Sequence, residues 1–374
     1  MSLEIHPRNR SDRPANLEDY VTAFSNEAIS PPGGDRYMKA FYTALVSVTE
    51  SHQPTQEFLK GIVEKRLLTP QHFTNLIFRV TQYIQLFKKQ NPDYPLSYDE
   101  PNKWKEEIPQ LIGQYRGLMS EMLLTKDTTT TIYQRYAGTA IVLNAFFPHK
   151  ELSIADFGCG ANYGLPGLVQ QVPFKEIDDQ TTDKRVTQLL IRQPQIKEGL
   201  SIDKVNPNDS MGKKWRIACS FYPNELDQRA ELAAFEKKIE DVEAVKFLQA
   251  DLLELRNNHE DGTLPYQYFD AVIMNSICYQ LYPEEQKIIF ETAKKSLKPD
   301  GIFIVQDFAK RDVDPKSLYF VPNWFAGPFL YRTFINGEFT SGKFKEFLQW
   351  FNGRCTRVRA GEDFEKLANS QPAR

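Results

Sequence analysis

The stretch from Ile154 to Gly164 constrains the fold more than any other part of the chain. A short apolar run ends at Asp156, Gly158 and Gly160 follow two residues apart, and a segment compatible with a helix comes next. Glycine allows left-handed backbone and close approach of a ligand, and a new helix presents unpaired N–H groups. The pattern predicts the strand, turn and helix that open a nucleotide-type site in a parallel α/β sheet.

Four further strand-like runs follow, and each ends at a polar residue. They are 200–202 before Asp203, 245–248 before Asp251, 269–274 before Asn275, and 302–305 before Gln306 and Asp307. Apolar residues at helical spacing predict a helix over about 283–297. Strands that alternate with helices favour a parallel sheet, and ligands bind such sheets at the carboxyl ends of the strands.

Residues from about 130 to 360 resemble a class I S-adenosylmethionine-dependent methyltransferase. The resemblance rests on Asp156-Phe-Gly-Cys-Gly160, on Asp203, on Ala-Asp251-Leu252, on Phe269-Asp-Ala-Val-Ile-Met-Asn-Ser276 and on Leu297-Lys-Pro-Asp-Gly-Ile-Phe-Ile-Val305. The whole chain also resembles an uncharacterised bacterial domain-of-unknown-function family with a methyltransferase-like fold. Both resemblances imply an α/β fold with a Rossmann-like, mostly parallel sheet and a final antiparallel strand. The second also implies a helical cap before the sheet, in agreement with the helical spacing of apolar residues over about 37–124.

The methyltransferase resemblance implies S-adenosyl-L-methionine as cofactor and assigns its contacts. Asp203 would accept from the ribose hydroxyls, and Asp251 from the adenine amino group while the Leu252 N–H donates to the ring. Asp156 would hold the turn or receive the cofactor ammonium, and the Asn275 carbonyl would lie beside the methionine portion. The remaining expected contacts are the turn residues Gly158, Cys159 and Gly160, and Arg135, which could pair with the cofactor carboxylate.

Each of these assignments has a structural alternative. Asp203 could be a simple turn or cap aspartate, Asp251 could be the N-cap of the following helix, and Arg135 could be a solvated arginine. The 45 residues between Gly158 and Asp203 are about twice the usual interval of about 20. An insertion at about 172–198, with an added strand at 186–191, accounts for the excess, and it contains the competing acids Asp178 and Asp179.

The turn also departs from the D-x-G-x-G-x-G pattern, because Asn162 stands where the third glycine would be. Asparagine tolerates left-handed backbone better than most residues, so we expect the turn to form. The third glycine of the dinucleotide pattern would fall at Tyr163, which disfavours a nicotinamide-dependent oxidoreductase.

Methyl transfer from a sulfonium needs alignment more than acid–base chemistry. No histidine follows the run at 269–274, so Tyr279 is the candidate catalytic residue, orienting the acceptor, although it could equally be a core aromatic. Gln280, Asp307 or a residue of the cap are the alternatives. Cys278 is disfavoured as a nucleophile. The five histidines and four cysteines are scattered without ligand spacing, so no metal is expected.

We expect two domains, a helical N-terminal cap at 1–126 and a methyltransferase-like domain at 127–374. Asp127 and the threonines after it would cap a helix at about 132–146. The cap domain is either a packing extension or a lid over the acceptor. Near the C-terminus, 329–335 and 356–358 would form an antiparallel strand pair, and aromatic residues at 319–339 would pack in the core or line an acceptor pocket.

The predicted function is methyl transfer from S-adenosyl-L-methionine to a small or medium-sized acceptor. The alternative is a catalytically inactive module that binds the cofactor as a sensor or partner subunit. A net charge of −3 makes nucleic acid an unlikely partner, and no apolar run is long enough to cross a membrane. Without a signal peptide or a disulfide framework, the expected location is cytoplasmic.

Overall fold

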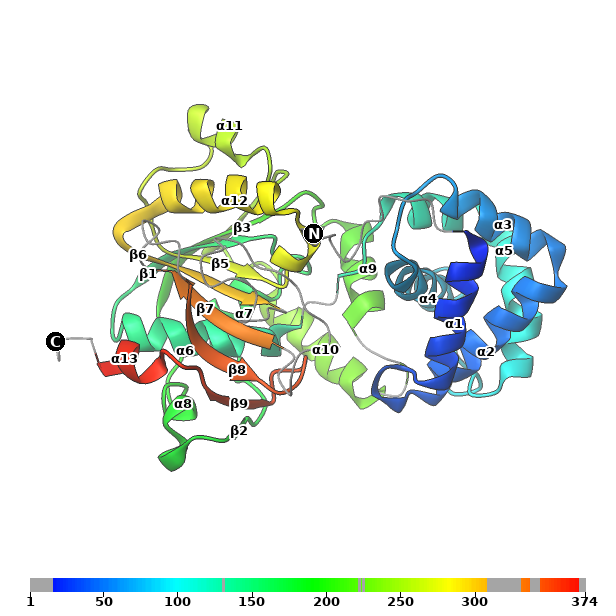
Figure 1. Ribbon diagram of the computed structural model, residues 1–374, viewed down its shortest axis with the longest axis horizontal. Helices are drawn as coiled ribbons and strands as arrows, with labels where there is room; N and C mark the ends of the chain where they lie inside the picture. The colour runs from blue at the N-terminus through cyan, green and yellow to red at the C-terminus, as the bar shows by residue number, and fades with distance from the viewer. Residues whose placement is uncertain are drawn as a thin grey trace, which may run out of the picture. The chain divides into compact units, whose positions relative to one another are not determined.

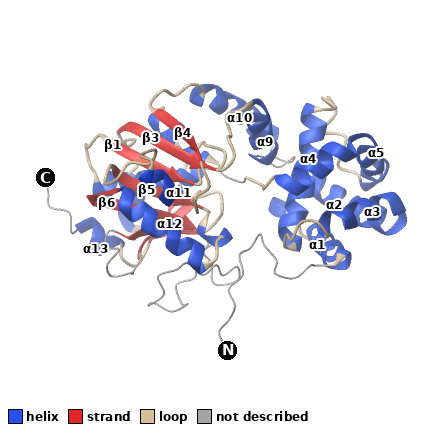
Figure 2. Ribbon diagram, turned by 90° about the horizontal axis from the view of Figure 1, so that it is seen from above, coloured by secondary structure: helices blue, strands red, loops and turns tan. Residues whose placement is uncertain are grey.

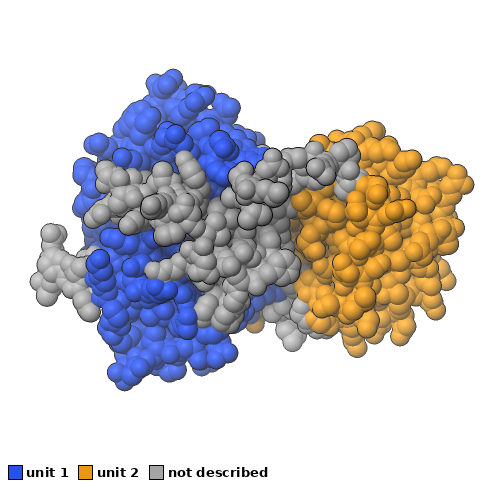
Figure 3. Space-filling view, in the orientation of Figure 1, with its two compact units in different colours: residues 1–5, 131–208, 236–374 blue, residues 6–130, 209–235 orange. Residues whose placement is uncertain are grey.

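A nine-stranded mixed sheet forms the larger of two structural units. The computed structural model describes residues 16–129, 132–220, 223, 226–307, 331–336 and 344–369. The sheet unit takes its described residues from 131–208 and 236–374, and the helical unit takes its own from 6–130 and 209–235 (Figure 3).

The strand order is β2-β9-β8-β7-β6-β5-β1-β3-β4. The strands are β1 Leu152–Phe157, β2 Asp178–Asp179, β3 Ile196–Asp203, β4 Val245–Gln249, β5 Phe269–Asn275, β6 Leu297–Asp307, β7 Tyr331–Asn336, β8 Lys345–Trp350 and β9 Arg357–Ala360. The predicted strands β1, β3, β4, β5 and β6 are all present. The central strands β1 and β5 are buried along their whole length, as expected of parallel strands covered by helices, whereas none of the residues of the edge strand β4 is fully buried.

The strand order reverses beside β1, which positions the candidate site. β1 pairs in parallel with β3 on one side and with β5 on the other, so Asp156 lies beside both Ser201 and Ile273. The chain runs outward from β1 through β3 to β4 and then returns to place β5 against the other side of β1. In an open parallel sheet, such a switch point opens a crevice at the carboxyl ends of the strands.

The C-terminal strands are antiparallel, as predicted, but their pairing differs from the prediction. β7 pairs with β6 and β8, and β9 pairs with β8, all antiparallel. The two segments expected to pair with each other are therefore separated by β8, a strand that the sequence analysis did not predict. The resulting fold is α/β, with a mixed, mostly parallel sheet whose last strands are antiparallel.

Helices cover both faces of the sheet (Figures 1 and 2). α12, at Pro283–Ser296, packs on β5 and β6, and α11, at Leu255–Glu260, contacts α12. On the other face, α6 at Ala137–Phe146 packs on β6, and α7 at Gly164–Val169 packs on β3 and β4. α13, Phe364–Asn369, lies against β8.

The insertion at 172–198 contains no strand at 186–191, so that prediction is wrong. The segment forms η3 (Thr182–Lys184) and the short helix α8 (Arg185–Gln188). The buried carboxylate of Asp179 accepts hydrogen bonds from the Thr187 N–H (2.8 Å) and the Thr181 N–H (2.9 Å), which folds the chain back on itself. Ile191 is 85% exposed, so the apolar run lacks the burial that would stabilise a strand.

The helical unit has a core of its own. Its helices are α1 Leu17–Ile29, α2 Arg36–Ser51, α3 Gln53–Val63, α4 Pro70–Phe87, α5 Pro101–Thr125, α9 Ser210–Ser220 and the first part of α10 Leu226–Ile239. Aromatic side chains fill the centre, with Phe41 packed edge-on against Tyr42, Phe78 and Trp104. A domain boundary at 127 would place α9 with the sheet, whereas its Trp215 and Ala218 belong to this helical core. The predicted domain limits stay a prediction.

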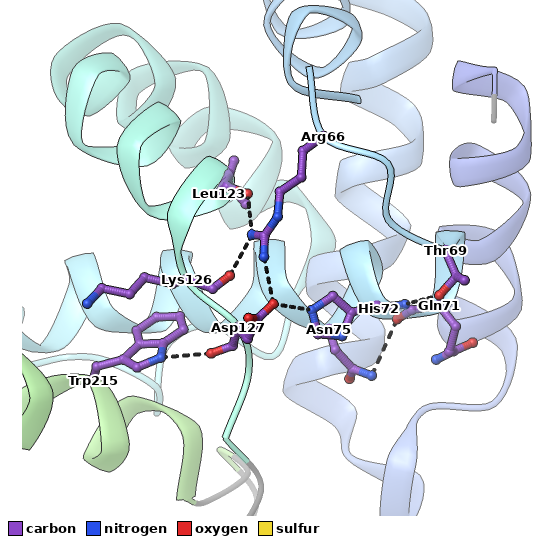
Figure 4. A network of polar contacts seen from close by, with 9 residues as sticks. All are labelled: Arg66, Thr69, Gln71, His72, Asn75, Leu123, Lys126, Asp127 and Trp215. Atoms are coloured by element: carbon purple, nitrogen blue, oxygen red, sulfur yellow. Dashed lines mark hydrogen bonds and ion pairs between the residues drawn. The ribbon is translucent and has the colours of Figure 1, made fainter. Parts of the chain in front are cut away.

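Asp127 does not cap a helix; it closes a polar network within the helical unit (Figure 4). The 3-10 turn η2 (Tyr133–Tyr136) that precedes α6 has no side-chain cap. Arg66 donates to the carbonyls of Leu123 (2.9 Å) and Lys126 (2.6 Å) and to the Asp127 carboxylate (2.6 Å). A cation at the end of α5 neutralises its unpaired carbonyls. The Trp215 indole donates to the Asp127 carbonyl (3.0 Å), which ties α9 to the same point.

Candidate functional site

The glycine turn follows β1 as the sequence predicts. Gly158 and Gly160 have φ values of +78° and +56°, and Asn162 has a φ of +53°. The expectation that Asn162 can take left-handed backbone is therefore confirmed. The N–H groups of Gly158 and Cys159 both donate to the Ile202 carbonyl (2.8 and 3.0 Å), which anchors the turn to the end of β3.

Gly158 is also required for packing inside the protein. A Cβ atom there would lie 2.6 Å from Ile277 Cδ1 and 3.4 Å from Leu252 Cδ1. The turn after β1 thus meets apolar side chains from the segments that follow β5 and β4. Leu252 was predicted to contact the adenine ring through its backbone N–H; its side chain packs beside Gly158 in this turn.

Asp156 is fully buried at the end of β1 and shares a hydrogen bond with Tyr136. The Tyr136 hydroxyl donates to Asp156 Oδ2 at 2.7 Å, whereas Asp156 Oδ1 has no partner among the described residues. Burial raises the pKa of Asp156 to about 7, with a further rise from Asp203, while the Tyr136 hydrogen bond opposes the shift. Burial also raises the pKa of Tyr136 well above its usual range, so Tyr136 remains a donor.

Two more buried oxygen atoms, one beside Asp156 and one in the glycine turn, have no partner among the described residues. Ser201 is beside Asp156 in register on β3, so both side chains point to the same face of the sheet. Ser201 Oγ and Asn162 Oδ1 are buried without a hydrogen-bond partner in the described part of the chain. Native proteins rarely leave buried acceptors unpaired, so unpaired acceptors near a glycine turn indicate a place for a donor-rich ligand.

Asp203 closes the other side of the turn. Its Oδ2 accepts from the Gly160 N–H at 2.9 Å, and its Oδ1 accepts from the Val205 N–H at 3.3 Å. Burial raises the pKa of Asp203, and the Gly160 hydrogen bond opposes that shift. Each carboxylate oxygen can accept a second hydrogen bond, so Asp203 retains acceptor capacity for hydroxyl groups.

The competing acids in the insertion lie far along the sheet from the turn. Asp178 and Asp179 form β2 at one end of the strand order, while β3 is second from the other end. Asp178 pairs with Arg357 at 3.1 Å, and Asp179 accepts from its own insertion. Both carboxylates therefore have partners in or beside the insertion.

Asp251 is exposed after β4 and forms a local turn. Its Oδ1 accepts from the Leu253 N–H at 2.9 Å, and α11 begins only at Leu255, with Glu254 as its N-cap. The N-cap alternative for Asp251 is therefore wrong, because the helix begins later. The Ala250 N–H donates to the Asp203 carbonyl at 3.0 Å, which holds the ends of β3 and β4 together.

Arg135 and Asn275 meet through the backbone of Arg135. The Asn275 amide donates to the Arg135 carbonyl at 3.3 Å, and the Gln306 amide donates to the same oxygen at 2.8 Å. The Arg135 Nε donates to the Gly353 carbonyl at 2.9 Å, so the guanidinium is half-buried and bonded rather than simply solvated. Gln306 also accepts from Thr333 at 2.9 Å, which extends this polar layer to β7.

The segment after β5 is only partly described. Its backbone forms η4 (Cys278–Gln280), and the side chain of Tyr279 lies outside the described residues. Ser276 has a φ of +61°, a rare conformation for a residue other than glycine that occurs at functional turns. Burial raises the pKa of the Cys278 thiol well above its usual range, which disfavours a thiolate nucleophile.

The structure adds three residues to the predicted site: Tyr136, Ser201 and Gln306. Tyr136 and Gln306 were visible in the sequence only as residues next to predicted site positions. Most of the aromatic segment at 319–339 lies outside the described residues, although Phe334 is buried in the core on the α12 face. In the described part of the chain, no group of three or more His, Cys, Asp or Glu side chains is placed to hold a metal ion. None of the described helices is long and apolar enough to span a bilayer.

Comparison with known proteins gives a distant structural similarity. No protein-family model and no curated protein matches the chain, so its resemblance to an uncharacterised bacterial family stays a prediction. An S-adenosylmethionine-dependent methyltransferase from Mesorhizobium loti is similar over 47% of this chain and 56% of its own, with 17% identity and a TM-score of 0.25. The 1,6-didemethyltoxoflavin-N1-methyltransferase of Burkholderia thailandensis, solved with S-adenosylhomocysteine, is similar over 64% of this chain and 68% of its own, with 14% identity and a TM-score of 0.27.

Spermidine synthase from Thermotoga maritima is similar at the same level, with 14% identity, 48% and 45% of the two chains covered and a TM-score of 0.27. This chain thus spans about half the length of the Mesorhizobium and Thermotoga proteins that it matches. Scores this low support no statement about activity. The fold assignment rests on the strand order and register described above.

Proposed function

We propose that the sheet unit binds S-adenosyl-L-methionine at the glycine turn and transfers its methyl group to a small or medium-sized acceptor. The observation that carries this proposal is the buried Asp156 carboxylate beside a left-handed glycine turn, because its Oδ1 receives no hydrogen bond from any residue that the structure describes. The turn lies at the switch point of a parallel sheet, where this class of fold binds ligands.

The residues around the turn fit this cofactor chemically. An α-ammonium group has the donors that Asp156 Oδ1 and Asn162 Oδ1 lack, and ribose hydroxyls could bind the remaining lone pairs of Asp203. Asp251 is exposed beside the end of β3 and could accept from the adenine amino group. The apolar side chains of Leu252 and Ile277 would lie beside the same turn. Arg135 as a carboxylate partner remains a proposal.

The protein would hold the cofactor, orient the acceptor toward it and exclude water from the site. When bound, the cofactor supplies a methyl group already activated by its sulfonium. Alignment of the acceptor can then contribute on the order of 7–11 kcal/mol in the best cases. Tyr279 would orient the acceptor, and the helical unit would act as a lid, which stays a prediction.

Thermal-shift measurements with S-adenosylmethionine, S-adenosylhomocysteine, NAD and NADP test the cofactor. We expect S-adenosylhomocysteine to stabilise the protein by about 2.7 kcal/mol at 100 times its dissociation constant. A shift with NAD and none with S-adenosylhomocysteine would overturn the proposal. Binding without formation of S-adenosylhomocysteine from any small-molecule acceptor would favour the inactive binding module.

Tyr279→Phe tests the catalytic assignment once an acceptor is known. Removing one hydroxyl should lower turnover about 10- to 100-fold, the scale of one or two hydrogen-bond energies, and leave cofactor affinity unchanged. A variant with normal turnover and weakened cofactor binding would transfer the role to Gln280 or Asp307.

A further inference from the structure

A polar cavity of about 380 Å³ lies at the opposite edge of the sheet, where β1 and β3 begin. The Leu152 N–H at the start of β1 donates to the Gln195 carbonyl just before β3, at 2.9 Å, which fixes this edge. Its lining includes Asn144, Phe147, His149, Ile191, Arg192 and Gln193.

The insertion and the end of α6 build this cavity together. Asn144 Nδ2, in the last turns of α6, donates to the carbonyls of Leu189 (2.6 Å) and Arg192 (2.8 Å). The Asn144 amide therefore holds the segment that carries Ile191, Arg192 and Gln193 against the sheet unit. Placing these side chains at the cavity is a role for an insertion that contributes nothing to the glycine turn.

Two side chains that line the cavity, Arg192 and Gln193, carry polar atoms without a partner in the part of the chain that the structure describes. Gln193 Oε1 is buried with no hydrogen-bond partner in the described part of the chain. Arg192 is exposed; its Nη1 lies 2.8 Å from Nδ1 and 2.9 Å from Nε2 of His149, and Nε and Nη2 have no partner among the described residues. A free guanidinium edge suits a carboxylate, and a buried amide oxygen requires an N–H or O–H donor.

Apolar surface lies beside these two groups. Phe147 lines the cavity, and Ile191 is 85% exposed there, which is unusual for so large an aliphatic side chain. A ligand with a carboxylate, a donor and an apolar part would use all of these features. The volume is within the range of small-molecule sites.

We propose that this cavity binds a free amino acid with an apolar side chain, independently of the glycine turn. The carboxylate pairs with Arg192, the ammonium donates to Gln193 Oε1, and the apolar side chain lies against Phe147 and Ile191. Such a ligand joins α6 to the insertion.

Calorimetric titration of the full chain with L-leucine, L-isoleucine and L-phenylalanine tests this proposal. We expect saturable binding of at least one of them, weakened tenfold or more when L-leucinamide or 4-methylpentanoate replaces L-leucine, since each lacks one charged group. Arg192→Gln should weaken binding at least tenfold, while the matched surface variant Arg256→Gln should bind as the wild type does.

Two further variants separate this cavity from the glycine turn. Gln193→Leu removes the unpaired acceptor together with the long 3.5 Å bond from Gln193 Nε2 to the Val172 carbonyl, so it should abolish binding while changing the melting temperature of the free protein little. Asp203→Ala should retain amino-acid binding. The proposal is overturned if none of the three amino acids binds, if Arg192→Gln binds normally, or if Asp203→Ala abolishes binding.

Discussion

Asp156 and Asp270 are both buried aspartates on adjacent strands of one sheet, yet their surroundings are opposite. Asp270, near the start of β5, is 2.8 Å from Lys150 Nζ, 2.9 Å from Lys298 Nζ and accepts from the Ser153 N–H at 2.9 Å. Asp156, at the end of β1, accepts from the Tyr136 hydroxyl, and its other oxygen has no donor among the residues described. The first carboxylate is fully satisfied by the protein, and the second is not.

The two pKa values differ accordingly. The hydrogen bonds from Lys150, Ser153 and Lys298 outweigh burial and lower the pKa of Asp270, whereas burial raises the pKa of Asp156 to about 7. A raised pKa with an oxygen unpaired among the described residues supports the ligand contact proposed for Asp156, while a lowered pKa beside two lysines fits a structural anchor at Asp270. Burial alone therefore does not distinguish the two roles.

Asp156→Asn should give the largest effect, and it should depend on pH. The pKa of Asp156 is above its value of about 3.8 in the unfolded chain, so its contribution to stability is greatest below pH 4 and is lost as the pH rises to about 7. Between pH 4 and pH 7, the free energy of unfolding of the variant should therefore rise relative to that of the wild type by on the order of 4 kcal/mol. Urea unfolding of both proteins between pH 4 and pH 8 measures this change. If the difference in unfolding free energy between variant and wild type does not vary with pH, Asp156 does not differ from Asp270 in the way described.

Asp270→Ala should show the opposite pattern. Its pKa is lowered in the folded state, so its stabilisation is present at neutral pH and is lost as the pH falls below about 4. Loss of two ion pairs and of the Ser153 hydrogen bond should cost about 3 kcal/mol at pH 7. The matched control is Asp300→Ala, because Asp300 is 75% exposed and 3.9 Å from the same Lys150. This exposed pair should contribute less than about 1 kcal/mol; equal losses would contradict the anchor role.

Asp203→Ala tests the proposed ribose contact at the end of β3. Asp203 holds the Gly160 N–H, and if it also accepts from ribose as proposed, its loss should weaken S-adenosylhomocysteine binding by roughly 1.5–3 kcal/mol, about tenfold or more. Calorimetry measures the affinity, and circular dichroism checks the fold. Asp178→Ala, at the far end of the sheet, should bind as the wild type does. The reverse outcome would move the ribose contact into the insertion.

Asp127→Asn, in the helical unit, should have the smallest effect. Its carboxylate is 36% exposed, and Arg66 keeps its bonds to the Leu123 and Lys126 carbonyls in the variant. We expect a loss of about 1 kcal/mol or less in chemical denaturation, with no change in cofactor affinity. A loss as large as that of Asp270→Ala would show that exposure is a poor guide to a carboxylate's contribution in this protein.

The sequence predicted those elements that follow from residues adjacent in the chain. Five strands follow apolar runs that end in polar residues, and Asn162 takes the left-handed backbone expected of it. The strand expected at 186–191 failed because the Asp179 carboxylate folds that segment into turns and leaves Ile191 in water. The bond between Tyr136 and Asp156 and the inclusion of Trp215 in the helical core depend on tertiary contacts, which periodicity does not encode.

The contrast between the two aspartates predicts that Asp156 accepts a donor group from a ligand while Asp270 does not. Calorimetric titration with S-adenosylhomocysteine between pH 6 and pH 8.5 tests it most directly. If Asp156 accepts the ligand ammonium, affinity should rise as the carboxyl loses its proton near pH 7, and this rise should disappear in Asp156→Asn. No binding at any pH, or an identical pH dependence in the wild type and the Asp156→Asn variant, would contradict the account.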